Sequence, residues 1–174
     1  YHGHTNTLID LSPYKFNGKG GLGQKDYVHI ADMPDGLRGE WKYSEKNWVN
    51  KYILQVKKMV KDIYKDNKKL SCFFAESILG CGGQVVLPPN YLKEVFKIIR
   101  KKNALCIIDE VQTGFGRVGN HFWAFEEHGV VPDIVTLGKP MGNGHPIAAV
   151  ITKKKIAKKF NNGMEYFNSF GGNP

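Results

Sequence analysis

Ser71-Cys-Phe-Phe-Ala-Glu76 and Ala104-Leu-Cys-Ile-Ile-Asp109 are the stretches that decide the fold. Each is a short apolar run that ends in a carboxylate, a pattern typical of a buried strand whose last residue reaches the edge of a sheet. Between them, apolar residues recur at three- and four-residue steps over residues 91–102, which predicts a helix. Strand, helix and strand in this order predict a right-handed βαβ unit with parallel strands.

The regions on either side continue this alternation. Apolar residues interleaved with lysines predict an amphipathic helix over residues 48–64. Downstream, we expect a short helix near residues 122–128, a strand at 133–137, a glycine-rich loop at 142–144 and a strand at 147–152. Residues 15–39 show no clear period and are expected to wrap the surface or the mouth of a site. The sequence therefore predicts an α/β layered domain.

Composition fits one soluble globular domain, with 174 residues of which 41% are hydrophobic. The 25 Lys and Arg residues exceed the 16 Asp and Glu residues, giving a net charge of +9 that would suit nucleic acid, an anionic surface or phosphorylated ligands. Many of the lysines fall on short helical stretches, where a solvated face is the expected reading. The sequence carries no RNP-type, zinc or helix-turn-helix signature, so a basic nucleic-acid-binding module remains only a remote alternative.

Cysteine usage and hydropathy indicate the compartment. The spacing of Cys72, Cys81 and Cys106 does not suit a metal site, so we expect reduced thiols and no metal. No apolar run approaches the roughly 20 residues of a membrane helix. The chain starts without Met and stops inside a motif, so we expect a fragment. The reduced thiols lead us to expect a cytoplasmic protein. A mitochondrial location stays open because a leader could precede Tyr1.

Polar residues stand where three of the predicted strands end, namely Glu76, Asp109 and Lys139. Ligands of parallel sheets gather at the carboxyl ends of strands, so one shared pocket is predicted. A carboxylate after a buried strand needs a partner, which for Asp109 could be a metal, a ribose hydroxyl or a protonated ring nitrogen. The alternatives are that Asp109 caps the loop at 110–116 and that Lys139 is an ordinary loop lysine.

Two ordered motifs then narrow these options. Ile108-Asp-Glu-Val-Gln-Thr-Gly-Phe-Gly-Arg117 and Thr136-Leu-Gly-Lys139 place a lysine thirty residues after Asp109. Together they resemble the cofactor signature of the class III aminotransferases, which depend on pyridoxal 5'-phosphate (PLP). The flanking motifs Tyr1-His-Gly3, Gly80-Cys-Gly-Gly83 and Ser169-Phe-Gly-Gly-Asn-Pro174 agree, so the resemblance covers essentially the whole chain.

The resemblance implies a fold and a domain organisation. The expected fold is the large domain of a fold type I PLP enzyme, three layers α/β/α around a mostly parallel sheet. Residues 1–174 would form an incomplete large domain. The N-terminal segment that binds the cofactor phosphate and the C-terminal small domain are expected outside this stretch.

The resemblance also implies roles for individual residues. Lys139 would be the catalytic residue, forming a Schiff base with PLP and moving the substrate proton. Asp109 would keep the pyridine nitrogen protonated, so that the ring acts as an electron sink. Other cofactor contacts are implied for Val111 on one ring face, Tyr1 on the other, Gln112 at the phenolic oxygen, Ser169 at the phosphate of a neighbouring subunit, and Glu76 beside the glycine loop. A homodimer with shared active sites follows.

The substrate is less narrowly indicated. Many class III aminotransferases have a second Glu at the position of Cys81. Residues 80–89, 138–146 and 164–168 resemble the branch that contains ethanolamine-phosphate phospho-lyase and alanine–glyoxylate-like aminotransferases. We therefore expect an enzyme that transfers an amino group from an amine or amino acid to a keto acid. The alternative is a PLP-dependent phospho-lyase acting on phosphoethanolamine-like substrates, since the same residues serve both reactions.

Overall fold

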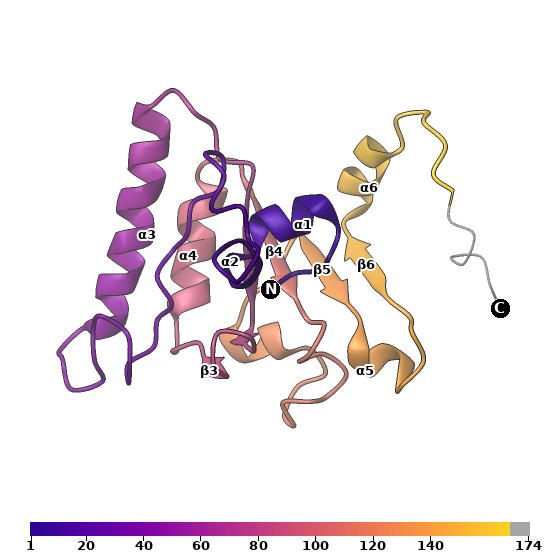
Figure 1. Ribbon diagram of the computed structural model, residues 1–174. Helices are drawn as coiled ribbons and strands as arrows, with labels where there is room; N and C mark the ends of the chain where they lie inside the picture. Colours follow the sequence, from indigo (N-terminus) through magenta and orange to yellow (C-terminus); the bar gives the residue numbers. More distant parts are fainter. Residues whose placement is uncertain (168–174) are drawn as a thin grey trace.

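The computed structural model describes residues 1–167 and contains a four-stranded sheet with the order β1-β4-β5-β6 (Figure 1). Its strands are β1 (Cys72–Glu76), β4 (Leu105–Asp109), β5 (Ile134–Leu137) and β6 (Ala149–Thr152). The first three pair in parallel, whereas β6 runs antiparallel to β5. The expected mixed α/β fold with a mostly parallel sheet is confirmed, and the predicted strands lie within two residues of the observed ones.

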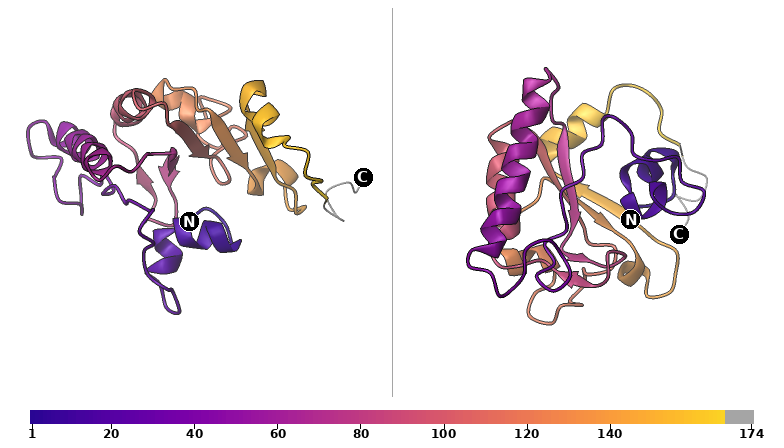
Figure 2. Two further views of the ribbon diagram at one scale, coloured as in Figure 1. Left: turned by 90° about the horizontal axis from the view of Figure 1, so that it is seen from above. Right: turned by 60° about the vertical axis from the view of Figure 1, so that its left-hand side comes forward.

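The two faces of the sheet carry different neighbours. Side chains alternate along a strand, so Phe73 and Phe74 of β1 point to opposite sides. The Phe73 ring meets Phe96 of α4 (Tyr91–Arg100) edge-on, while the Phe74 ring stacks on His2. Figure 2 accordingly shows α4 on one side of the sheet and the N-terminal segment on the other.

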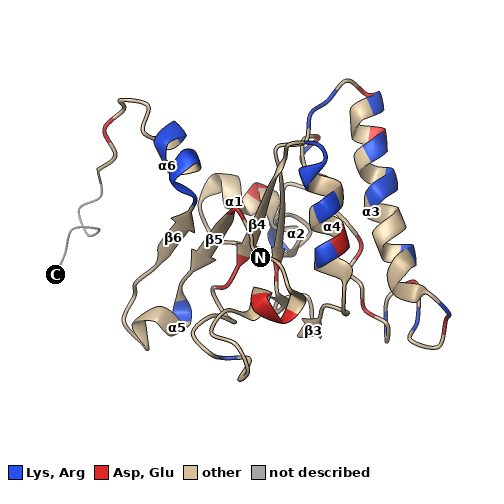
Figure 3. Cartoon of the chain, turned by 180° about the vertical axis from the view of Figure 1, so that it is seen from behind, with Lys and Arg blue, Asp and Glu red and all other residues tan. Residues whose placement is uncertain are grey.

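The core lies between the sheet and two long helices. In α3 (Trp48–Lys65) the buried residues recur every three or four positions, and in α4 one face is buried entirely. Their side chains join Cys106 and Ile108 of β4 in a single hydrophobic cluster. Lysines occupy the opposite faces of these helices and of α6 (Lys154–Phe160), as Figure 3 shows. Much of the positive charge therefore lies on solvated helix faces.

Shorter elements complete the chain. They are α1 (Asn6–Leu11), α2 (Pro13–Phe16), β2 (Ile78–Leu79), β3 (Val85–Val86), the 3-10 helix η1 (Ala124–His128) and α5 (Lys139–Gly142). The helix expected near residues 122–128 is thus a 3-10 helix, and Lys139 begins a short helix directly before the expected glycine loop. Within the sequence, α1 and α2 are too short to show an amphipathic period.

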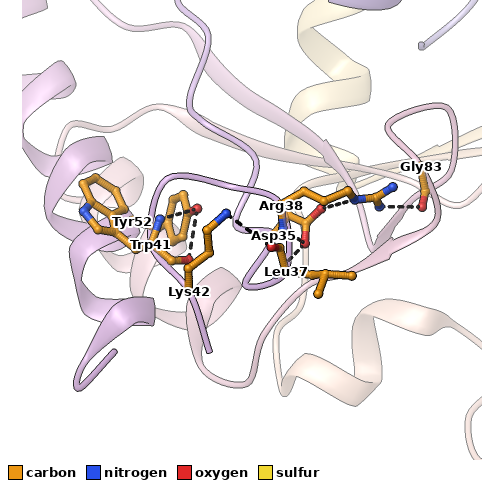
Figure 4. A network of polar contacts seen from close by, with 7 residues as sticks. All are labelled: Asp35, Leu37, Arg38, Trp41, Lys42, Tyr52 and Gly83. Carbon is orange, nitrogen blue, oxygen red and sulfur yellow. Dashed lines mark hydrogen bonds and ion pairs between the residues drawn. The ribbon is translucent and has the colours of Figure 1, made fainter. Parts of the chain in front are cut away.

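The irregular segment between α2 and α3 is held by several contacts, two groups of which are drawn in Figure 4. At one, the Asp35 carboxylate accepts a hydrogen bond of 3.0 Å from Nε of Arg38, whose Nη2 lies 3.4 Å from the carbonyl oxygen of Gly83. At the other, the Trp41 N–H donates to the Tyr52 hydroxyl of α3 over 3.2 Å. The segment therefore joins α3 to the glycine loop that follows β1.

The three cysteines are free thiols in different environments. Cys106 is buried in β4, and burial raises its pKa to about 12, whereas Cys81 is exposed in the glycine loop. Within residues 1–167, no cluster of three or more His, Cys, Asp or Glu side chains could hold a metal ion. In the same range, no helix has the length and apolar character that a bilayer crossing requires.

Candidate active site

Two of the predicted polar residues, Glu76 and Asp109, end the parallel strands β1 and β4, and Lys139 follows the end of β5. All three therefore lie at the C-terminal ends of the parallel strands. Glu76 pairs with Asp109 across β1 and β4, and Asp109 pairs with Thr136 across β4 and β5. Residues paired in register point to the same face. Lys139 follows Thr136 by three residues and begins α5. The sheet therefore places Glu76 beside Asp109 and the backbone of Lys139 just beyond the next strand.

The buried carboxylate of Asp109 is held on both oxygens. Oδ1 accepts a hydrogen bond of 2.9 Å from the Val111 N–H, and Oδ2 lies 2.9 Å from Nδ1 of His2. The His2 ring stacks on Phe74 with 3.8 Å between ring centroids. Asp109 thus caps its loop, as one reading of the sequence predicted, and also has a fixed imidazole partner.

His2 is the residue of this site that the sequence interpretation missed. The Tyr1-His-Gly3 motif was interpreted through Tyr1 alone. His2 and Asp109 are 107 positions apart, a separation at which neither hydrophobic period nor spacing reports contact. The imidazole inside that motif was the available signal, because an imidazole can pair with a carboxylate at a strand end.

Glu76, Gly80 and Gln112 are packed against one another. The Glu76 carboxylate accepts a hydrogen bond from the Gly80 N–H, and a Cβ added to Gly80 would lie 2.7 Å from Nε2 of Gln112. The end of the Gln112 side chain therefore occupies the space that a side chain at position 80 would need. Burial raises the pKa of Glu76, and the charge on Asp109 acts in the same direction, against the Gly80 hydrogen bond.

The exposed side chain of Lys139 lines a polar cavity of about 300 Å³. The lining residues are Gln112, Arg117, Lys139, Pro140, Asn143 and Gly144. A Cβ added to Gly138 would lie 2.9 Å from Cγ1 of Val111, so the backbone before Lys139 packs closely on the loop after β4. Two cations and no acid line this cavity, which favours a ligand with an anionic group.

Tyr1 lies in a different environment, and Ser169 lies outside the described residues. The Tyr1 ring neighbours those of His4 and Tyr14. It lines a separate, largely apolar cavity of about 860 Å³ between the N-terminal segment, α3 and β1, whose wall also includes Glu76. The structure therefore brings Gln112 and Lys139 into one cavity and Tyr1 and Glu76 into another, and Asp109 lines neither of the two. The prediction of one pocket shared by Glu76, Asp109 and Lys139 is thus wrong, because the side chains at neighbouring strand ends open into different cavities.

Comparison with known proteins identifies the family. The profile described as Aminotransferase class-III matches residues 1–174. The chain belongs to the class III aminotransferase family. Class III aminotransferases use PLP. A related solved structure, the ornithine aminotransferase from Toxoplasma gondii, is described with PLP partly occupying its active site. It is 29% identical to this chain with a TM-score of 0.69, over 94% of this chain and 33% of that one.

Several class III relatives resemble the chain over its whole length. It is 44% identical to "Alanine--glyoxylate aminotransferase 2-like" of Drosophila melanogaster and 43% identical to "Ethanolamine-phosphate phospho-lyase homolog 1" of Caenorhabditis elegans. It spans 36% and 40% of these two proteins, respectively. Among solved structures, a phospholyase from Arthrobacter in complex with phosphoethanolamine has a TM-score of 0.84 and 29% identity, over 98% of this chain and 39% of that one.

The site has several of the groups that this family's cofactor requires. Among residues 1–167, the buried Thr136 hydroxyl has no hydrogen-bond partner, and it stands next to Asp109 in the sheet. The exposed side chain of Lys139 lines a cavity at the lower end of the volumes of small-molecule sites. The Asp109 carboxylate, the unpaired Thr136 hydroxyl and the exposed Lys139 side chain, all near the C-terminal ends of the strands, therefore fit PLP.

Proposed function

We propose that the full-length protein is a PLP-dependent aminotransferase that moves an amino group from an amine or amino acid to a keto acid. The observation that carries this proposal is the strand register in a class III aminotransferase: Asp109 pairs with Thr136, and Lys139 follows three residues later. When bound, PLP supplies a ring that stabilises negative charge at the substrate carbon. The protein's own side chains would bind and orient the cofactor and would move the protons.

Each residue of the site has a distinct task in this proposal. Lys139 would bind the cofactor covalently and would move a proton at the substrate carbon, since its exposed side chain lines the cavity. Asp109, which contacts His2, would hold the proton of the ring nitrogen. Gln112 would donate to the phenolic oxygen, and Val111 would pack on one face of the ring. Ser169 would contact the cofactor phosphate in the neighbouring subunit of a homodimer.

A phospho-lyase is the second candidate, and specific observations favour it. The similarity to the Arthrobacter phospholyase and to the phospho-lyase homolog of Caenorhabditis elegans supports phosphoethanolamine-like substrates. In addition, Cys81 is exposed in the glycine loop where many relatives have a carboxylate. A neutral side chain there would not repel a phosphorylated substrate.

One experiment tests the proposal and separates the two reactions. The full-length protein, loaded with PLP, is given amines with keto acids, or phosphoethanolamine alone. Keto acid consumption identifies the aminotransferase, and phosphate release identifies the lyase. We expect Lys139→Ala to abolish either activity and the visible band of bound PLP, while Lys154→Ala on α6 leaves both intact. Turnover at the wild-type rate in the Lys139→Ala protein would refute the assignment of this lysine.

A further inference from the structure

Glu110, between Asp109 and Val111, is a buried carboxylate that the proposed chemistry does not use. Its side chain is 0% exposed. Its two oxygens accept four hydrogen bonds. Oε1 accepts from the Ser77 hydroxyl at 2.8 Å and from the Phe125 N–H at 2.9 Å. Oε2 accepts from the Thr113 hydroxyl and from the Ala124 N–H, both at 3.0 Å. None of the ion pairs formed by residues 1–167 includes Glu110. Hydrogen bonds alone therefore compensate this charge.

The four donors come from separate parts of the chain. Ser77 follows Glu76 at the end of β1, while Ala124 and Phe125 begin η1. The backbone of Glu110 is fixed as well, because its N–H donates to the Thr136 oxygen over 2.9 Å and its carbonyl accepts from the Gly114 N–H over 3.1 Å. Glu110 thus joins the ends of β1, β4 and β5 to η1.

We infer that Glu110 is a positioning residue that sets where Val111 and Gln112 stand relative to Lys139. The inference rests on the proposed function. Gln112 is exposed and lies two residues from Glu110, and its near neighbour Gly80 has no side chain with which to hold it. Beside the hydrogen bond from the Val111 N–H to Asp109, the Glu110 carboxylate is the main side-chain anchor of the loop, so a change there would move the Gln112 amide.

The donor set requires a carboxylate at this position. In a Glu110→Gln variant the amide NH₂ would replace one oxygen, and it would then face one hydroxyl and one backbone N–H. The hydroxyl of Ser77 or Thr113 can turn to accept a hydrogen bond, but the N–H of Ala124 or Phe125 cannot. One buried donor always stays opposed to another donor. The loop must then shift, although the side chain keeps its shape.

The test uses the full-length protein loaded with PLP and compares Glu110→Gln with Glu126→Gln, a matched change on η1. The readouts are kcat/KM and the pH midpoint of the visible band of bound PLP. We expect Glu110→Gln to lower kcat/KM about 100-fold and to move the midpoint in the same direction as Gln112→Ala. The double variant should show no further movement, and Glu126→Gln should match the wild type.

Each outcome decides the inference. Suppose that Glu110→Gln lowers the melting temperature but leaves the pH midpoint and kcat/KM unchanged. Glu110 would then have a purely structural role, and the inference would be overturned. If Glu110→Gln does not fold, Thr113→Val removes a single donor and must still move the midpoint, and its failure to do so would overturn the inference. Absence of a PLP band in the wild type would instead refute the proposed function, and the inference with it.

Discussion

Among single residues, the proposed function depends most on the Asp109 carboxylate. Both of its oxygens are engaged, by the Val111 N–H and by His2, and yet each carboxylate oxygen can accept two hydrogen bonds. Asp109 therefore keeps the capacity to accept a third donor from a protonated ring nitrogen. The existing contacts orient it for that partner without using up its acceptors.

An Asp109→Asn substitution tests this view. The amide is neutral. Its oxygen can still accept from the Val111 N–H while its NH₂ donates to Nδ1 of His2, so the substitution removes the negative charge and keeps the shape. We expect the full-length variant to retain some PLP but to lose at least about 100-fold in kcat/KM, because the ring nitrogen loses its charged partner. Steady-state kinetics and the PLP spectrum measure both effects, and exposed Asp66→Asn is the control. Near-normal rates in Asp109→Asn would contradict the role given to this acid.

Glu76 gives a prediction about pH. Its pKa is raised from the usual 4.5, chiefly by burial, so the folded state binds a proton more tightly than the unfolded chain. Its contribution to stability is fully present below that usual value and is lost as the pH rises through the raised pKa. In cofactor-free protein, the free energy of unfolding of Glu76→Gln relative to wild type should therefore increase over this window. Urea unfolding at several pH values measures this difference, and a difference that does not change with pH would disprove the shift.

At the scale of elements, packing between α4 and the sheet should dominate stability. Leu92 of α4 is 0% exposed, whereas Leu54 of α3 is 59% exposed. We expect Leu92→Ala to lower the free energy of unfolding by about 2–5 kcal/mol, because it removes buried methyl groups and leaves a cavity. Leu54→Ala should change it by no more than about 0.5 kcal/mol. Chemical denaturation compares them, and equal losses would contradict the assignment of the core.

The elements also show how far sequence reasoning reaches. Apolar runs predicted β1, β4, β5 and β6, and apolar periods predicted α3 and α4, because burial leaves these patterns in the sequence. Short elements without such a pattern, α1 and α2 among them, were not predicted. The strand-end rule placed Glu76 and Asp109 side by side, but contacts between distant loops, such as those of His2 and Glu110, leave no periodic signal.

At the scale of the whole molecule, the proposed homodimer gives the sharpest test. If Ser169 serves the neighbouring subunit, Lys139→Ala and Ser169→Glu damage different sites of a mixed dimer. Dissociating and reassociating the two inactive full-length variants should restore up to about one quarter of wild-type activity, since half of the dimers are mixed and each has one intact site. Lys139→Ala mixed with Asp109→Asn is the control. Recovery no greater than in that control would argue against shared sites.

The contact between His2 and Asp109 has a consequence for how the protein matures. It closes a loop of more than a hundred residues, and contacts of such long range form late because the entropy of loop closure opposes them. The acid is thus fully oriented only once the segment that contains His2 has docked onto the sheet. Tight capture of the vitamin-derived cofactor is then expected to follow folding, so the rate at which the colour of bound PLP appears would report the last step of assembly.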